Sequence, residues 1–192
     1  YTATIPAVLL FVLFLVSGAS ASILDDIRQN QSGVNSVKSS FRQEKHTELF
    51  NRTIKTEGTF YFKASVGVRW EYGDEMLVIY DGENLYLHYI ELKEAEKVQG
   101  VSGFVGPLSF DIEELVRDYE VEAEEKEGKY SLHLIPLKQV PFESMDMIFD
   151  KDGSFPEKVT IMEQTGDFIS RGVEAKPLDH EKKWHFNPTP GK

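Results

Sequence analysis

Hydrophobic and polar residues alternate through much of the chain, which is the pattern of β-strands with one apolar face. Phe60 and Phe62 lie two positions apart, as do Val68 and Trp70, with a more polar residue between the members of each pair. Further strand candidates follow between turn signals such as Asp-Gly and Glu-Gly. They span residues 76–80, 85–90, 130–135, 144–149, 158–162, 168–174 and 184–187. Many short strands joined by tight turns predict a meandering antiparallel sheet that is strongly curled or forms a barrel.

Two stretches depart from this alternation and favour helices. Near the start, apolar residues recur at roughly helical spacing at Ile23, Leu24, Ile27, Val34, Val37 and Phe41. We expect a short N-terminal helix there, with a break near Gly33. In the middle of the chain, Ile112, Leu115, Val116 and Tyr119 share one helical face. Asp111 and Glu114 form the Asp-x-x-Glu pattern of a capping box, which predicts where this second helix begins.

A glycine-rich loop over residues 100–107 precedes the second helix and carries Phe104 and Val105. Glycine permits a hinge, and exposed apolar side chains need a surface to cover. The loop and the helix after it therefore form a candidate lid. An ordinary connector with a few core contacts is the alternative.

The beginning of the chain has the pattern of a secretory signal peptide. An apolar stretch from Ala7 to Val16 is followed by small residues that end in Ala-Ser-Ala at Ala21. Cleavage after Ala21 would separate a signal peptide, residues 1–21, from a single mature domain, residues 22–192. An uncleaved membrane anchor is the alternative, because Ile5 to Leu24 approaches the ~20 residues of a membrane span. Pro6 and the serine and glycine residues near the end of the stretch suit processing better.

Charge and cysteine content narrow the possible functions. The net charge is -11 and no basic cluster is evident, which argues against a nucleic-acid partner. A run of glutamates at Glu122, Glu124, Glu125 and Glu127 is expected to form a solvated face. The chain has no cysteine, which rules out a disulfide, a thiolate metal site, a cysteine nucleophile and lipidation of the chain at its own cysteine.

Catalytic and metal-binding patterns are not found. Of the five histidines, only His180 and His185 are close in sequence, at a spacing that no standard metal motif uses. The common hydrolase, nucleotide and dinucleotide motifs do not occur. We therefore expect no enzyme, no metal and no cofactor. The aromatic content does exceed the background, with 13 Phe, 8 Tyr and 2 Trp. These residues fill either an ordinary core or the wall of a ligand cavity, and periodicity does not distinguish the two.

Four segments together resemble the LolA family of outer-membrane lipoprotein carriers. They are Val37–Gln43 with Phe-x-Gln, Gly58–Lys63 followed by the Arg-Trp-x-Tyr of Val68–Tyr72, the Asp-Gly hairpin of Val78–Tyr86, and the Phe-x-Pro-x-x-Gly of Phe186–Gly191. Their order and spacing cover nearly the whole mature chain. Ala64-Ser65 stands where the family has Arg-Pro, so the arginine that the family uses to hand its cargo onward is absent here.

The resemblance implies a mainly β, α+β fold: an unclosed antiparallel β-barrel with a helical lid over an apolar cavity. It also implies a monomeric periplasmic carrier without a cofactor. Such a carrier takes acylated lipoproteins from an inner-membrane ABC transporter like LolCDE and delivers them to the outer membrane, often to a receptor like LolB. A periplasmic sensor of lipids or lipoproteins like RseB, and a carrier of glycolipids, are alternatives on the same scaffold.

The alternation and the resemblance together give a set of candidate binding residues. Toward the cavity we place Phe60, Phe62, Val68, Trp70, Leu77, Ile79, Leu85 and Leu87. In the lid we place Phe104, Val105, Ile112 and Leu115.

Overall fold

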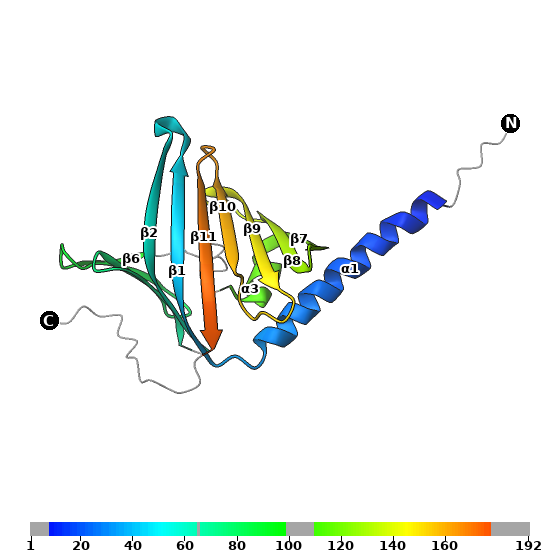
Figure 1. Cartoon of the computed structure of the whole chain (residues 1–192), viewed down its shortest axis with the longest axis horizontal. Coiled ribbons are helices and arrows are strands. Elements are labelled where there is room, and N and C mark those ends of the chain that lie inside the picture. The colour runs from blue at the N-terminus through cyan, green and yellow to red at the C-terminus, as the bar shows by residue number, and fades with distance from the viewer. Residues whose placement is uncertain (1–7, 65, 99–109, 178–192) are drawn as a thin grey trace.

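The structure, a computed structural model, describes residues 8–64, 66–98 and 110–177, with side chains described between residues 20 and 173 of these ranges. Eleven strands in this part of the chain form one antiparallel sheet (Figure 1). Their order across the sheet is β6-β5-β4-β3-β2-β1-β11-β10-β9-β8-β7. The strands are β1 (Ser36–Thr47), β2 (Arg52–Lys63), β3 (Gly67–Tyr72), β4 (Met76–Tyr80), β5 (Leu85–Tyr89), β6 (Glu94–Val98), β7 (Tyr119–Lys126), β8 (Lys129–Pro136), β9 (Phe142–Asp150), β10 (Lys158–Glu163) and β11 (Phe168–Pro177).

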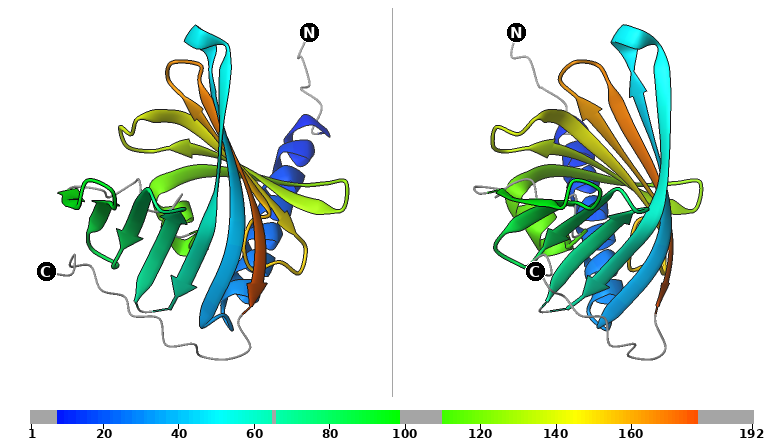
Figure 2. Two further views of the ribbon diagram at one scale, coloured as in Figure 1. Left: turned by 60° about the vertical axis from the view of Figure 1, so that its left-hand side comes forward. Right: turned by 90° about the vertical axis from the view of Figure 1, so that its left-hand side faces the viewer.

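The sheet consists of two meanders joined through β1, which pairs with β2 on one side and with β11 on the other. β6 and β7 end the strand order, and no strand within the described ranges pairs with the free side of either. The sheet curls, so that its β3–β6 part and its β7–β10 part lie to either side of the β1–β11 pair (Figure 2). The predicted fold class is confirmed: a mainly β chain with an unclosed antiparallel sheet and helices.

Helix α1 (Val8–Gln31) packs against the β7 end of the sheet. Its Ile23 and Ile27 are buried in the main core. The hydroxyl of Tyr130 in β8 donates a hydrogen bond to the carboxylate of Asp26 at 2.6 Å, which ties the helix to the sheet. The rest of α1 extends away from the sheet (Figure 1). No helix within the described ranges is long and apolar enough to cross a membrane.

The helical spacing near the start of the chain continues further than the helix does. The spacing predicts helical residues as far as Phe41 with a break near Gly33, whereas α1 ends at Gln31, and Val37 and Phe41 belong to β1. Spacings of three and four residues fit a helix, but Val37, Ser39 and Phe41 are the buried residues of a strand. Pairing of β1 with two neighbours overrides the weak helical spacing. The predicted signal-peptide cleavage position after Ala21 falls within α1.

Helix α3 (Ile112–Asp118) begins where the capping pattern predicts. The carboxylate of Asp111 accepts hydrogen bonds from the backbone amides at positions 113 and 114, at 2.8 and 3.4 Å. Ile112 and Leu115 are buried, as expected. Val116 is instead exposed, and Tyr119 begins β7, because the helix ends at Asp118.

The expected strands over residues 76–80, 85–90, 130–135, 144–149, 158–162 and 168–174 are present, with small shifts at their ends. The sequence pattern does not predict β6 and β7. In β6 the two apolar residues, Ala95 and Val98, are three positions apart and do not alternate. In β7, glutamates stand at every second position with only Val121 and Ala123 between them. The exposed glutamates of β7 do form a solvated face, as predicted. The expected strand over residues 184–187 lies outside the described residues.

Candidate functional site

The inner face of the curled sheet is the side on which the two meanders share one core. Residues that face each other in an antiparallel pair lie on the same side of the sheet. Phe60 faces Trp70, and Phe62 faces Val68, so these four predicted residues share the inner face. Leu85 and Leu87 belong to it too, because they face Tyr80 and Val78, which in turn face Val68 and Trp70. Six of the eight predicted cavity residues therefore lie on one face.

Leu77 and Ile79 lie on the opposite face, and their assignment to the cavity is wrong. Leu77 faces Glu71, and Ile79 faces Arg69, both of which point away from the inner core. The reason lies in the sequence of β4. Every residue from Met76 to Tyr80 is apolar, so hydrophobic alternation does not indicate which residues face inward. Ile79 is nevertheless only 1% exposed on that outer side.

The middle of the inner face is filled by aromatic rings of the protein itself. The rings of Phe60 and Trp70 have their centroids 4.5 Å apart, and Phe110 lies 5.7 Å from Trp70. Phe155 closes the group at 6.0 Å from Phe60. Phe41 of β1 reaches Trp70 edge-on at 4.9 Å. This floor of aromatic rings is a packed core, and it leaves no room for a ligand in the centre.

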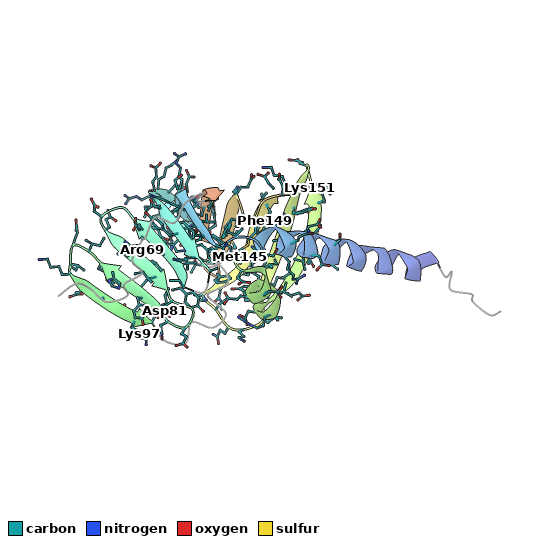
Figure 3. All side chains as sticks on the ribbon, turned by 90° about the horizontal axis from the view of Figure 1, so that it is seen from below. Arg69, Asp81, Lys97, Met145, Phe149 and Lys151 are labelled. Atoms are coloured by element: carbon teal, nitrogen blue, oxygen red, sulfur yellow. The ribbon has the colours of Figure 1, made fainter. Side chains whose placement is uncertain are left out.

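Apolar residues around this floor are only half buried. They are inner-face or loop residues that pack against the core while keeping part of their surface exposed: Tyr72, Met76, Leu87, Val98, Val121, Val140 and Ile161. They come from both meanders. Figure 3 shows Met145 and Phe149 of β9 near the middle of the molecule, while Lys97 lies at the far edge of the other meander. We call these seven half-buried residues the apolar bowl.

Two hollows lie along the sheet. The larger has a volume of about 1100 Å³ and lies along β1, β11 and the turn before β10. Its lining includes Phe41 and Val173, but also Arg42, Glu57 and Lys158, which strand pairing places on the outer face. The smaller, about 330 Å³, lies between α3 and the ends of β2 to β4. Its lining includes the predicted residues Phe62 and Val68 together with Tyr80, Asp111 and Glu114.

Of the predicted lid, α3 is described and the loop before it is not. Ile112 and Leu115 contribute to the same core as the inner face, so α3 covers part of the sheet. Phe104 and Val105 lie outside the described residues. No group of three histidine, aspartate or glutamate side chains within the described ranges could hold a metal ion.

Sequence reasoning missed one buried charge on the inner face. Arg171 of β11 faces Gln43 of β1 and is 7% exposed. Burial lowers the pKa of its guanidinium from the ordinary value. The alternation of Ile169, Arg171 and Val173 could have placed it beside two apolar residues that face inward.

The comparison with protein families decides what kind of chain this is. The model of the family described as outer membrane lipoprotein carrier protein LolA matches residues 32–174. This chain belongs to the LolA family.

Solved structures support the LolA fold. An uncharacterized conserved protein from Thermus thermophilus aligns over 88% of this chain and 95% of its own, with a TM-score of 0.52 and 12% identity. A domain named for outer membrane lipoprotein sorting, from Vibrio parahaemolyticus, aligns over 85% of this chain and 94% of its own, with a TM-score of 0.50 and 11% identity. At such identities the likeness concerns the fold.

Curated proteins match only a short segment. An A-type ATP synthase subunit of Pyrococcus horikoshii is 64% identical over 28 residues, which are 15% of this chain and 3% of that protein. The corresponding ATP synthase subunit of Pyrococcus abyssi matches to the same extent. The chain thus spans a very small part of these relatives, and the match carries no function to the whole chain.

Four of the LolA motif residues of this chain contact one residue, Arg171. Phe41 and Gln43 of the Phe-x-Gln segment, and Trp70 and Tyr72 of the Arg-Trp-x-Tyr segment, all contact Arg171. At the position of the family's Arg-Pro, Ala64 does not take part in this cluster. It has only a methyl side chain, and its backbone amide donates a hydrogen bond to the carbonyl oxygen of Asn35 at 2.9 Å. These four motif side chains thus lie on the inner face, around Arg171.

Proposed function

We propose that the protein is a non-enzymatic carrier that holds the acyl chains of lipoproteins, or of related lipids, against the apolar bowl. The observation that carries this proposal is the partial exposure of the bowl on a sheet whose edge strands β6 and β7 have no second partner strand within the described ranges. An acyl chain in water costs about 0.8 kcal/mol for each exposed CH₂ group. A soluble shuttle therefore needs an apolar surface that its own side chains leave partly uncovered.

Loading and release need contact with a lipid-bearing surface, and one end of the sheet suits such contact. Alternate turns of an antiparallel meander lie at the same end of the sheet. At this end, the backbone amide of Glu48 donates a hydrogen bond to the carboxylate of Asp167 at 2.8 Å, which joins the β1–β2 and β10–β11 turns. The turns at this end carry the exposed apolar side chains Leu49 (83%), Phe50 (73%), Leu92 (67%) and Leu137 (63%). The β1–β2 tip is prominent in Figure 2.

The described turns at the opposite end carry no exposed large apolar side chain. Asp81 accepts hydrogen bonds from the amides of Glu83 and Asn84, and the β7–β8 and β9–β10 turns are built from Glu127, Gly128, Lys151 and Asp152. Exposed apolar side chains gathered on the turns of one end are typical of an interaction site. This asymmetry supports a carrier that meets its donor and acceptor with one end.

The signal-peptide pattern at the start of the chain and the family support a proposed route. We propose secretion through a signal peptide cleaved after Ala21, loading in the periplasm by a LolCDE-like transporter, and delivery to the outer membrane. The core residues of α1, Ile23 and Ile27, lie after that cleavage position and would remain in the mature chain. Because Ala64 replaces an arginine, delivery to a LolB-like receptor would use other contacts. Mass spectrometry of the mature N-terminus tests the cleavage.

The binding proposal is tested by a pair of substitutions on one strand. Met76 and Leu77 are adjacent and similarly half buried, but only Met76 faces the apolar bowl. Met76→Glu places a charge where the acyl chain would lie, so it should weaken the binding of a triacylated peptide by about tenfold or more. Leu77→Glu is the matched control and should bind like the unaltered protein.

The measurement is the amount of triacylated peptide kept in solution by the protein, with the same peptide without acyl chains as reference. Equal retention of both peptides by the unaltered protein would show that the acyl chains are not recognised. If both substitutions weaken peptide binding equally, acyl binding does not depend on the inner face. Appearance of a cleaved peptide would point to an enzyme instead.

A further inference from the structure

Arg171 lies on the inner face between the aromatic floor and the apolar bowl. Its guanidinium lies over the ring of Trp70, 4.2 Å from the centroid, and 5.6 Å from that of Phe41. On the neighbouring strand it faces Val159, and one step further toward the turn the pair Ile161 and Ile169 shares its face. A fixed cation therefore lies beside half-buried apolar residues, inside the curl of the sheet.

The hydrogen-bond partners of Arg171 are all uncharged. Its Nε and Nη2 donate to Oε1 of Gln43 at 3.2 and 2.6 Å, and Nη2 also donates to the hydroxyl of Tyr72 at 3.1 Å. Among the residues that the structure describes, no hydrogen bond reaches its Nη1 and no carboxylate pairs with it. Glu163, at the end of β10, pairs with Lys45 instead, at 2.9 Å.

A buried guanidinium without an anion is costly. Taking a charge out of water costs several kcal/mol unless a partner of opposite charge and further hydrogen bonds offset that cost. The ring contacts with Trp70 and Phe41 and the neutral hydrogen bonds offset only part of it. The site therefore has an unmet preference for an anionic oxygen.

We propose that Arg171, with Tyr72 and Gln43, binds the anionic headgroup of an amphiphile whose hydrocarbon chain lies on the apolar bowl. This inference rests on the proposed function and names the class of lipid that the bowl prefers. Arginine recognises carboxylate and phosphate oxygens with paired, charge-assisted hydrogen bonds. Nη1 supplies a donor, and Tyr72, Met76 and Ile161 supply the nearby apolar surface.

The consequence is a selectivity that an apolar pocket alone would not show. Longer chains would raise the affinity of neutral and anionic lipids alike. At equal chain length, the charge of the headgroup would make the affinity of the anionic lipid higher. A lipid with a carboxylate or phosphate should bind more tightly than the alcohol with the same chain. Charge-assisted hydrogen bonds are strong enough to make this difference about tenfold or more.

The test compares three ligands with one chain: dodecanoate, dodecyl phosphate and dodecanol. Each displaces a fluorescent neutral lipid probe from the full protein, from Arg171→Met and from the control Arg42→Met. Arg42 lies on the outer face of β1, pairs with the exposed Glu57, and is itself mostly exposed. The unaltered protein and the control should prefer at least one anion over dodecanol by about tenfold. Arg171→Met should bind dodecanoate and dodecyl phosphate no more tightly than it binds dodecanol.

Circular dichroism first verifies that each variant folds. If Arg171→Met is poorly folded, Arg171→Gln replaces it, because a glutamine can still pair with Tyr72 and Gln43. Comparison of carboxylate with phosphate identifies which headgroup the site takes.

Two results would overturn the inference while leaving the carrier proposal standing. One is equal binding of all three ligands by the unaltered protein. The other is an anion preference that persists in Arg171→Met. Failure of every ligand to displace the probe, together with failure to retain a triacylated peptide, would overturn both the carrier proposal and this inference.

Discussion

At Gly58, backbone and side chains approach each other too closely to leave room for a side chain. A Cβ atom at this position would collide with the carbonyl oxygen of Glu71 and with the ring of Phe41, which lies opposite on β1. A backbone atom cannot move aside as a flexible side chain can. The glycine of the family-like Gly-x-x-x-x-Lys segment is therefore required by the packing that brings Phe41 onto Trp70.

The first prediction concerns this glycine. Gly58→Ala should lower the free energy of unfolding by about 1–3 kcal/mol, since it forces extra volume into a packed core. Gly33→Ala is the control, because a Cβ there meets no atom within 4 Å. Urea unfolding midpoints measure both. Equal midpoints for the two variants would show that the Glu71 backbone and the Phe41 ring can both shift at no cost.

Asp118 is a second residue whose surroundings matter, because they shift the pKa of its carboxyl group. Its carboxylate, with a side chain only 6% exposed, pairs with Arg117 at 2.9 Å and Lys138 at 3.0 Å. The hydrogen bond from Arg117 is the largest cause that lowers the pKa of Asp118, and burial opposes it. The lowered pKa means that the ionised form is favoured in the folded state.

The second prediction follows from the sign of this shift. A carboxyl group with a folded-state pKa below its unfolded value of about 3.9 stabilises the fold above that pH, and the contribution is lost as the pH falls through the folded-state pKa. Asp118→Asn should therefore be less stable near pH 7 and lose less stability on acidification. Thermal unfolding between about pH 7 and pH 3 measures the slopes, with Asp74→Asn in an exposed turn as control. Parallel profiles for Asp118→Asn and the unaltered protein would contradict the prediction.

At the scale of elements, a single amide holds three segments together. Gln31, the last residue of α1, donates from Nε2 to the carbonyl oxygens of Phe110 at 2.9 Å and Ser154 at 3.1 Å. Its Oε1 accepts a hydrogen bond from the amide of Ile112 at 3.2 Å. The end of α1, the start of α3 and the β9–β10 turn thus share one side chain.

The third prediction is that Gln31→Ala loosens α3 more than it harms the sheet. Three lost hydrogen bonds should cost about 1–3 kcal/mol, concentrated where α3 begins. Amide hydrogen exchange of α3 should accelerate, while exchange in β1 and β2 stays slow. Gln29→Ala, at an exposed position of the same helix, is the matched control. Unchanged exchange at Ile112 would show that the packing of Leu115 alone holds α3.

The elements also show how far the sequence predicts this structure. Alternation and turn signals locate strands such as β4 and β5 to within a residue, and the cap at Asp111 locates α3. The face of β4 cannot be predicted, because five consecutive apolar residues fit either side, and only its pairing with β3 decides. Arg171 escapes prediction because its importance depends on Gln43 and Tyr72, which are distant in the chain. The local sequence pattern therefore predicts most helices and strands. Which residues meet at the candidate site depends on the pairing of strands that are distant in the chain.

At the scale of the whole molecule, an unclosed sheet must protect two free edges. Exposed strand edges pair readily with other chains unless charges, bulges or a covering element prevent it. β6 carries Glu94, Glu96 and Lys97 along its five residues. On β7, helix α1 packs against the strand, and glutamates cover the outer face. We expect these charges to keep the protein monomeric despite its open architecture.

The last prediction removes the charges from one edge. Glu122→Val with Glu124→Val converts the outer face of β7 into an apolar, β-favouring surface, so edge-to-edge pairing should produce dimers or larger species as concentration rises. His133 and Ser131 lie directly opposite these positions on the interior strand β8. The double variant His133→Val with Ser131→Val therefore adds a similar apolar surface to the same face without touching an edge, and it should remain monomeric. Light scattering coupled to size-exclusion chromatography measures the mass of each. Association of both double variants would mean that an apolar outer face alone drives it, whereas association of the β7 variant alone would show that the glutamates protect a strand edge which the open sheet leaves unpaired.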